Sequence, residues 1–133
     1  MGVLKKFAED IKNAVYNQND EVYFEFENEK ISSHTANIYS LVGIKNIVCG
    51  EVKETASGKL FPLAANIRVT VMAKPQNTAL QIYDYFDNTV LDKFGGLEWA
   101  VKSFKTEEIE YDVNYDRKIL TAVFVLLANY KGT

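Results

Sequence analysis

The sequence holds little of the chemistry on which enzymes and metal proteins depend. It has one cysteine, Cys49, and one histidine, His34, in 133 residues. A single cysteine excludes an intrachain disulfide and a cysteine-based metal site, so we expect Cys49, inside an apolar run, to be a small core residue. His34 stands beside Ser32, Ser33 and Thr35. Because no Gly-x-Ser-x-Gly elbow accompanies these serines, we expect a loop rather than a hydrolase site.

Neither sign of charge dominates, and no apolar run is long. Fifteen basic and 18 acidic residues give a net charge of −3, and no Lys/Arg cluster predicts a nucleic-acid partner. The longest apolar run is shorter than the about 20 residues that a membrane-spanning helix needs. The first ten residues include acids and lack a long apolar core, so no signal peptide is expected. We therefore expect one cytoplasmic domain over residues 1–133, with no membrane partner, metal or cofactor.

The apolar run near the end of the chain organises the predicted fold. Ten of the twelve residues from Ile119 to Tyr130 are apolar or aromatic. A buried helix would also suit such a run, but the β-branched Thr121, Val123 and Val125 and the lack of a cap favour a strand. Because the run has no polar face, it predicts a central strand that is covered on both sides.

Apolar residues at helical spacing predict two amphipathic helices. The first covers about residues 3–16. The second begins at Asn77 or Thr78 as its N-cap and ends at Gly95-Gly96. The predicted apolar stripe of the second helix consists of Ala79, Ile82, Tyr83, Phe86, Val90 and Phe94.

Alternating apolar and polar residues predict strands elsewhere. Residues 21–27 read as an edge strand with an acidic outer face. Residues 38–52, with two glycines, predict one long strand or two joined at a bulge or turn, and residues 60–74 return antiparallel to it. These strands would present sheet edges that contact between subunits would cover.

The stretch before the last hairpin is open to two interpretations. Residues 97–104 fit a short helix as well as a connection, and Trp99 within them suits a surface anchor as well as a core plug. Residues 108–115 then alternate. We expect their apolar members, Ile109, Tyr111, Val113 and Tyr115, to point inward.

Two polar surfaces are the candidate partner contacts. One is the hairpin tip, with Glu54, Thr55, Ser57 and Lys59. The other consists of Glu108, Glu110 and Asp112 on the last hairpin. Acids two apart on a strand lie about 7 Å apart and project in parallel into solvent, so they predict a charged surface rather than a metal site.

The predicted order is helix, strand, long hairpin, helix, short helix, hairpin. It defines an α+β fold with a mainly antiparallel sheet, two main helices packed on one face, and long hairpins. The part from Leu60 to Tyr130 contains a strand ending near Pro75, a helix from Asn77-Thr78 to Gly95-Gly96, a short helical piece and an apolar final strand. In this order and in its length, the chain resembles the tail terminator proteins of long-tailed bacteriophages and related phage-tail-like particles.

The resemblance implies a structural assembly subunit and not an enzyme. Proteins of that family form a hexameric ring on the last ring of the tail tube, halt its polymerisation, and offer the head its docking surface. The implied partners are further copies of the chain, the tail tube protein, and sheath or neck proteins. The implied location is the cytoplasm during assembly and then a virion or a phage-tail-like particle, which a prophage could encode and whose tail is either contractile or non-contractile.

Two other functions are compatible with the residues. One is another particle component, such as a neck, tube or baseplate subunit. The other is a small-molecule-binding α+β domain, which would need a pocket with converging polar groups.

Overall fold

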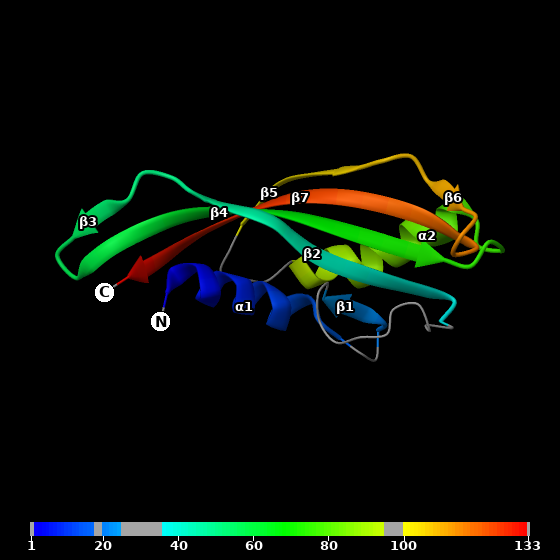
Figure 1. Ribbon diagram of the computed structural model, residues 1–133, viewed down its shortest axis with the longest axis horizontal. Coiled ribbons are helices and arrows are strands. Elements are labelled where there is room, and N and C mark those ends of the chain that lie inside the picture. The colour runs from blue at the N-terminus through cyan, green and yellow to red at the C-terminus, as the bar shows by residue number, and fades with distance from the viewer. Residues whose placement is uncertain (1, 18–19, 25–35, 95–99, 133) are drawn as a thin grey trace.

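The computed structural model describes residues 2–17, 20–24, 36–94 and 100–132 (Figure 1). The elements are α1 Val3–Val15, β1 Val22–Phe24, β2 Ile38–Cys49, β3 Lys53–Thr55, β4 Gly58–Ala73, α2 Ala79–Tyr85, β5 Ala100–Thr106, β6 Glu110–Asp112 and β7 Arg117–Gly132. The strands form one sheet in the order β1-β2-β4-β7-β5, with β3 beside β4 and β6 beside β7. Among these described strands, only β1 pairs in parallel. The predicted α+β class and mainly antiparallel sheet are confirmed.

The two longest strands, β4 and β7, run the length of the molecule side by side (Figure 1). Their pairing extends from Lys59 opposite Gly132 to Ala73 opposite Lys118. On the other side of β4, β2 forms the predicted antiparallel partner. Its register shifts between Ile44 and Asn46, so the extra residue is Lys45 and not one of the two glycines.

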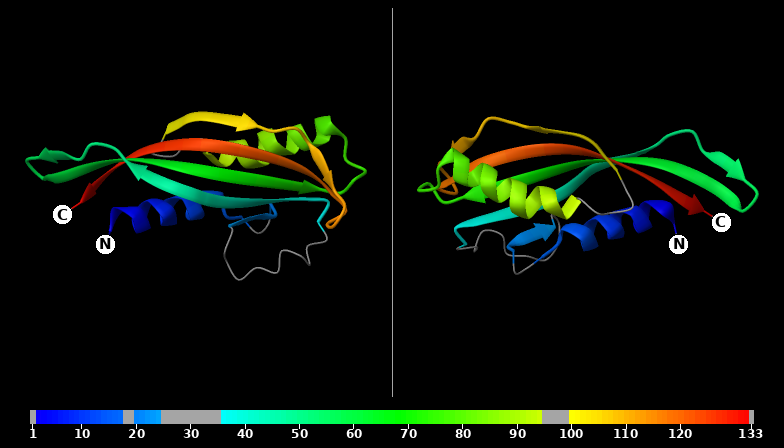
Figure 2. Two further views of the ribbon diagram at one scale, coloured as in Figure 1. Left: turned by 45° about the horizontal axis from the view of Figure 1, so that its top comes forward. Right: turned by 180° about the vertical axis from the view of Figure 1, so that it is seen from behind.

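Both helices pack on one face of this sheet, as predicted. The view from behind in Figure 2 shows α2 in front of the long strands. The alternate residues of β4 and β7 that face the helices are buried: Leu63, Ala65, Ile67, Val69, Val71, Ala73, Leu120, Ala122, Phe124 and Leu126. They form one core with Phe7, Ile11 and Val15 of α1 and with Ile82, Phe86, Val90 and Phe94. Burial of these apolar surfaces is the main stabilising contribution of the fold.

The prediction that both faces of the last strand are covered is wrong. The strand β7 is interior to the sheet, between β4 and β5, as predicted. However, Val123 and Val125 are only partly buried, and the side chain of Leu127 is 39% exposed. Both helices lie on the opposite face, so nothing among the described residues covers this part of β7. The apolar run therefore has one core face and, from Val123 to Leu127, one open face, while Ile119 at its start packs against the buried Met72.

The second helix begins where the sequence predicts. Thr78 is the N-cap, and its Oγ1 accepts a hydrogen bond from the Gln81 backbone N at 3.2 Å while Gln81 Oε1 accepts one from the Thr78 N at 2.8 Å. After α2 the chain stays helical, first as a π-helical segment, Phe86–Val90, and then as a 3-10 segment, Leu91–Phe94. Ala79 and Tyr83 were predicted to lie in its apolar stripe, but both are exposed. The predicted stop at 95–96 lies outside the described residues, as do His34 with its neighbouring serines and Trp99.

Residues 100–106 form a strand, β5, and not a helix. A stacked pair explains this difference, because Phe104 lies opposite Phe124 of β7 with ring centroids 5.2 Å apart. This cross-strand contact and the ladder with β7 are available only to an extended backbone. Residues 97–99 lie outside the described part of the chain.

The last hairpin is shorter and more exposed than predicted. Only Glu110–Asp112 forms a strand, β6. The side chains of Tyr111, Val113 and Tyr115, predicted to point inward, are 53%, 78% and 56% exposed. The chain turns here before β7, with Asp116 at φ 50, and no second layer lies beyond the turn in the described residues. The alternation therefore predicts the right environment for Ile109, which packs against the core, and the wrong one for the other three.

Three smaller expectations are also corrected. Cys49 is exposed and not a core residue. The alternation over residues 21–27 predicts that Tyr23 lies on the acidic outer face of that strand, but Tyr23 is buried in a second cluster with Tyr39 and Met72. Finally, β4 is an interior strand, but among the described residues β1 pairs only with Ser40–Val42, so the sheet ends at β1 with the rest of β2 and at β5 with β6.

Candidate assembly surfaces

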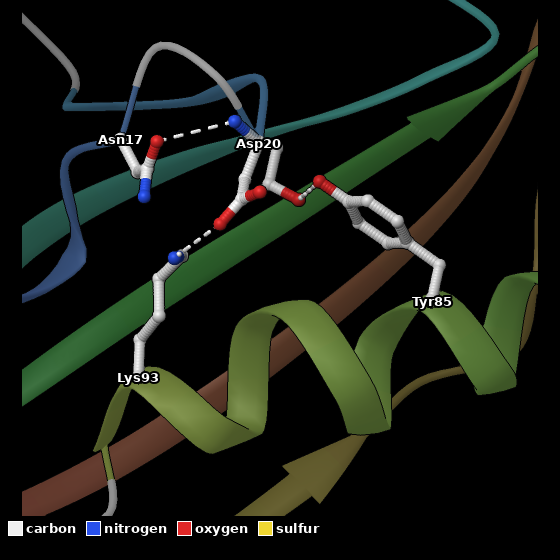
Figure 3. Close-up of polar contacts among 5 residues, drawn as sticks. Asn17, Asp20, Tyr85 and Lys93 are labelled. Carbon is white, nitrogen blue, oxygen red and sulfur yellow. Dashed lines mark hydrogen bonds and ion pairs between the residues drawn. The ribbon is translucent and has the colours of Figure 1, made fainter.

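A polar cluster joins the turn before β1 to the second helical layer (Figure 3). Lys93 Nζ lies 2.9 Å from Asp20 Oδ2, and the Asp20 backbone N donates to Asn17 Oδ1 at 3.2 Å. Ser40 on β2, which is fully buried, donates from Oγ to the Tyr85 hydroxyl at 2.8 Å. Tyr85 and Lys93 both point from the helical layer toward the turn in Figure 3. The cluster fixes the first strand against the helices.

The Tyr85 hydroxyl is the hydrogen-bond acceptor in this cluster. Burial raises the pKa of Tyr85 to about 12, the Ser40 hydrogen bond opposes this, and the nearby charges of Asp20 and Glu21 raise the pKa further. A phenol with a pKa this high stays protonated at neutral pH and is a poor general base. The hydrogen bond between Ser40 and Tyr85 therefore serves to hold β2 against the helical layer.

A second polar network lies at the end of the sheet where β2 and β7 begin. Arg117 is 7% exposed and donates from its guanidinium to the carbonyl oxygens of Ala36 at 2.7 Å and Asn37 at 3.1 Å. Its guanidinium carbon lies 5.1 Å from the centre of the Tyr39 ring. These contacts hold the start of β7 against the start of β2, and the charge of Arg117 is engaged within the chain.

The predicted contact residues on the hairpin tip are all exposed. Glu54 on β3 pairs with Lys59 on β4, and the turn between them contains Ser57. Thr55 Oγ1 donates to the Gly58 carbonyl oxygen at 2.8 Å. Gly58 has φ +131, and a Cβ there would lie 2.8 Å from the Gly132 carbonyl oxygen, so glycine is required for this tight turn. The hairpin extends to one end of the molecule (Figure 1).

The predicted acidic contact residues lie at the other end. Glu108 and Glu110 are exposed, and Asp112 is partly buried. Glu110 and Asp112 lie opposite Ile119 and Arg117 on β7. In Figure 1, β3 and β6 occupy opposite ends of the sheet, so the structure does not bring the two predicted surfaces together.

The open face of the sheet is a surface that the sequence analysis missed. One row across it consists of Val48, Ala64, Leu127 and Ala100 on β2, β4, β7 and β5. Val48 is 54% exposed and Leu127 is 39% exposed. Directly opposite residues on neighbouring strands point to the same side of a sheet, so the row forms one apolar strip. On β4, the alternate residues that face this side are Asn66, Arg68, Thr70 and Met72. This mixture of polar and apolar residues is the sequence signal of a face that is neither core nor fully solvated.

A second row crosses the same face at Val123, four residues before Leu127 on β7. It consists of Gly43, Arg68, Val123 and Lys105, and we call it the basic row because of its arginine and lysine. Arg68 and Lys105 are exposed. No ion pair or hydrogen bond engages either side chain within the part of the chain that the structure describes. This region of the open face thus combines apolar area with two positive charges, although the whole chain has a net charge of −3.

The outer side of the second helical layer combines exposed apolar side chains with negative charges. Leu80 is 80% exposed and Tyr83 is 40% exposed. Asp84 and Asp87 are exposed as well. Leu80, Tyr83 and Asp84 lie on α2, and Asp87 follows in the π-helical segment. Residues spaced i, i+3, i+4 and i+7 share one side of a helix, so these four form one stripe, pointing away from the sheet.

Two absences concern the described residues alone. No three His, Cys, Asp or Glu side chains among them gather where they could hold a metal ion. No helix among them is long and apolar enough to cross a membrane.

No family model matches the sequence. No curated protein matches it either. Among solved structures, the chain is similar to a sheath/tube terminator, in the extended state, of an extracellular contractile injection system called PVC. The two chains are 10% identical, and the similarity has a TM-score of 0.38 and covers 99% of this chain. This chain spans 58% of the length of that protein.

Proposed function

We propose that this protein is a structural assembly subunit of a phage tail or phage-tail-like particle. Copies of it form a hexameric ring at the end of the tail tube, which stops tube polymerisation and provides the surface where the head or neck docks. The proposal rests on the order of elements from Leu60 to Tyr130, which resembles tail terminator proteins, and on the surfaces of the chain.

The observation that carries the proposal is the one-sided sheet. Both helices cover one face, and the other face exposes Val48 and Leu127, at 54% and 39%, in one apolar row. A contiguous exposed apolar surface on a small domain marks a site of protein–protein contact. A subunit that is incomplete by itself and complete in a ring has this property.

The overhanging hairpin suits the same role. Its tip residues, including Glu54 and Lys59, are exposed and form their own turn. The adjacent part of β4 pairs with β7 as far as Gly132, so the hairpin is a rigid arm rather than a loop. A rigid arm with a polar tip contacts a neighbouring subunit or the tube without the entropic cost of ordering a loop.

Deletion of the gene tests the function directly. Tails are purified from cells that lack the gene and imaged by electron microscopy, with the wild-type gene supplied in trans as the control. We expect overlong or ragged tubes in the deletion and normal length on complementation. Tails of normal length with a normally capped end would contradict the proposal. Complete loss of tubes would indicate a tube or baseplate role instead.

A further inference from the structure

The two surfaces that the fold leaves unpartnered face in opposite directions. The open face of the sheet lies on the side away from the helices, whereas the stripe of α2 that contains Leu80 points away from the sheet on the helical side. A subunit that presents one surface on each side can associate head to tail with identical copies. The chemistry of the two surfaces decides whether they fit.

Their charges are complementary. Arg68 and Lys105 flank Val123 on the open face, while Asp84 and Asp87 lie on the exposed side of the second helical layer. No cation pairs with either aspartate among the described residues, although Asp84 Oδ1 accepts a hydrogen bond from Asn88 at 2.9 Å. Opposite charges on two surfaces steer them together and fix their register.

The other helix does not offer such a surface. On α1, Lys5 lies 3.8 Å from Glu9, and Lys6 lies 2.9 Å from Asp10. These charges compensate one another along the helix, so α1 presents no net acidic stripe to a basic partner. The choice between the two helices therefore favours α2.

The spacing of the apolar and charged groups also agrees. On β7, the apolar row at Leu127 and the basic row at Val123 are four residues apart, which is about 13 Å at the rise of an antiparallel strand. On the helix, Leu80 and Asp87 are seven residues apart, which is about 10 Å along the axis. A helix lying along the strands therefore places its apolar end on the apolar row and its acidic end beside the basic row.

We propose that neighbouring subunits associate through these surfaces, with the Leu80–Asp87 stripe of one copy docked on the open sheet face of the next. The apolar row receives Leu80 and Tyr83, and the basic row receives Asp84 and Asp87. This inference rests on the proposed ring, because repeated head-to-tail contacts close into a ring when the rotation per subunit allows it. It identifies the interface and the occupant of the open face, a second copy of the same chain.

Disulfide trapping tests the contact. In a Cys49→Ser background, Leu80→Cys and Leu127→Cys are introduced together and the concentrated protein is oxidised. The two new cysteines lie on opposite sides of one copy, so they are expected to link different copies into a covalent ladder on a non-reducing gel. The matched control combines Leu127→Cys with Leu4→Cys, since Leu4 is an exposed leucine, at 53%, on the other helix. A ladder no stronger than that of the control would overturn the proposal.

Charge reversal in the same background tests the register. Because like charges across an interface repel, Arg68→Glu with Lys105→Glu should weaken the ladder about tenfold or more, and Asp84→Lys with Asp87→Lys should do the same. Mixing the two reversed proteins should restore the ladder, with the two kinds of copy alternating one to one by mass spectrometry. A mixture that stays as weak as its components would show that these charges do not meet.

The interface and the capping function can fail separately. Overlong tubes after gene deletion, together with no specific disulfide ladder, would leave the terminator role standing and reject this interface. A specific ladder together with tails of normal length after deletion would establish the interface and reject the terminator role.

Discussion

The Ser40 Oγ lies 2.8 Å from the Tyr85 hydroxyl and donates a hydrogen bond to it across the boundary between β2 and α2. Ser40 is fully buried. Replacement of Tyr85 by Phe therefore removes this acceptor from a buried hydroxyl, which should lower the free energy of unfolding by about 1–3 kcal/mol. Urea denaturation of the wild type and the variant measures the difference.

The double variant Ser40→Ala with Tyr85→Phe is the control for this contact. It removes both partners, so its loss of stability should be smaller than the sum of the losses of Ser40→Ala and Tyr85→Phe. Strict additivity would show that the hydrogen bond contributes nothing to stability.

Alkaline pH should destabilise the protein through the same tyrosine. Burial raises the pKa of Tyr85 from 10.0 to about 12. The folded state thus keeps this proton after the unfolded state has lost it, so the contribution is complete below pH 10 and disappears as the pH rises toward 12. The total is on the order of 2 kcal/mol. Denaturation between these pH values should show a shallower loss in Tyr85→Phe; an identical loss in both proteins would contradict this assignment. Tyr39, whose pKa burial also raises, accounts for part of the remaining slope.

The two faces of β7 should respond differently to the same substitution. Phe124 is fully buried among other aromatic rings, so Phe124→Asp leaves an unpaired charge in the core and should prevent folding. Val123 is partly exposed on the open face, and its cross-strand neighbours there are Arg68 and Lys105. Val123→Asp places a carboxylate between two cations and should fold. Circular dichroism during heating distinguishes the two, and loss of cooperative melting in Val123→Asp would mean that this face is covered.

Local patterns predict the elements well where one interaction decides the structure. Helix α1 and strand β4 follow from periodicity, and the start of α2 follows from the capping ability of Thr78. Burial is harder to predict, because it depends on what lies on each side of the sheet. The run at 119–130 looks apolar all round, yet only one side of β7 meets the helices. The short apolar segments at 100–104 and 111–115 fit several structures until the partner strand is known.

The candidate surfaces also divide into one that the local sequence predicts and one that depends on strand pairing. The sequence predicts that the hairpin tip is polar and exposed, and the structure has Glu54 and Lys59 exposed there. The basic row on the open face was not predictable, because Arg68 and Lys105 are 37 residues apart in sequence and lie on two strands that both flank β7. Only the pairing register brings them together.

The N-cap of α2 offers a direct measure of local stability. Thr78→Ala removes the acceptor for the Gln81 backbone N and should cost about 1 kcal/mol in the free energy of unfolding. Thr78→Ser keeps the hydroxyl and should cost much less. Chemical denaturation of the three proteins gives both values; equal losses in the two variants would show that the methyl group of threonine matters and the cap does not.

The hairpin tip should matter for assembly and not for stability. Glu54 and Lys59 lie opposite each other on β3 and β4, so exchanging them, Glu54→Lys with Lys59→Glu, preserves the cross-strand pair and reverses each local charge. The free energy of unfolding should change by less than about 0.5 kcal/mol, because both side chains are on the surface. If the tip contacts a neighbour or the tube, the exchanged protein should fail to restore normal tail length in cells that lack the gene. The matched control exchanges Lys5 and Glu9, an exposed pair on α1, which should restore normal length. Equal restoration by both exchanged proteins would remove the tip from the assembly contacts and leave the open face as the surface that joins the subunits.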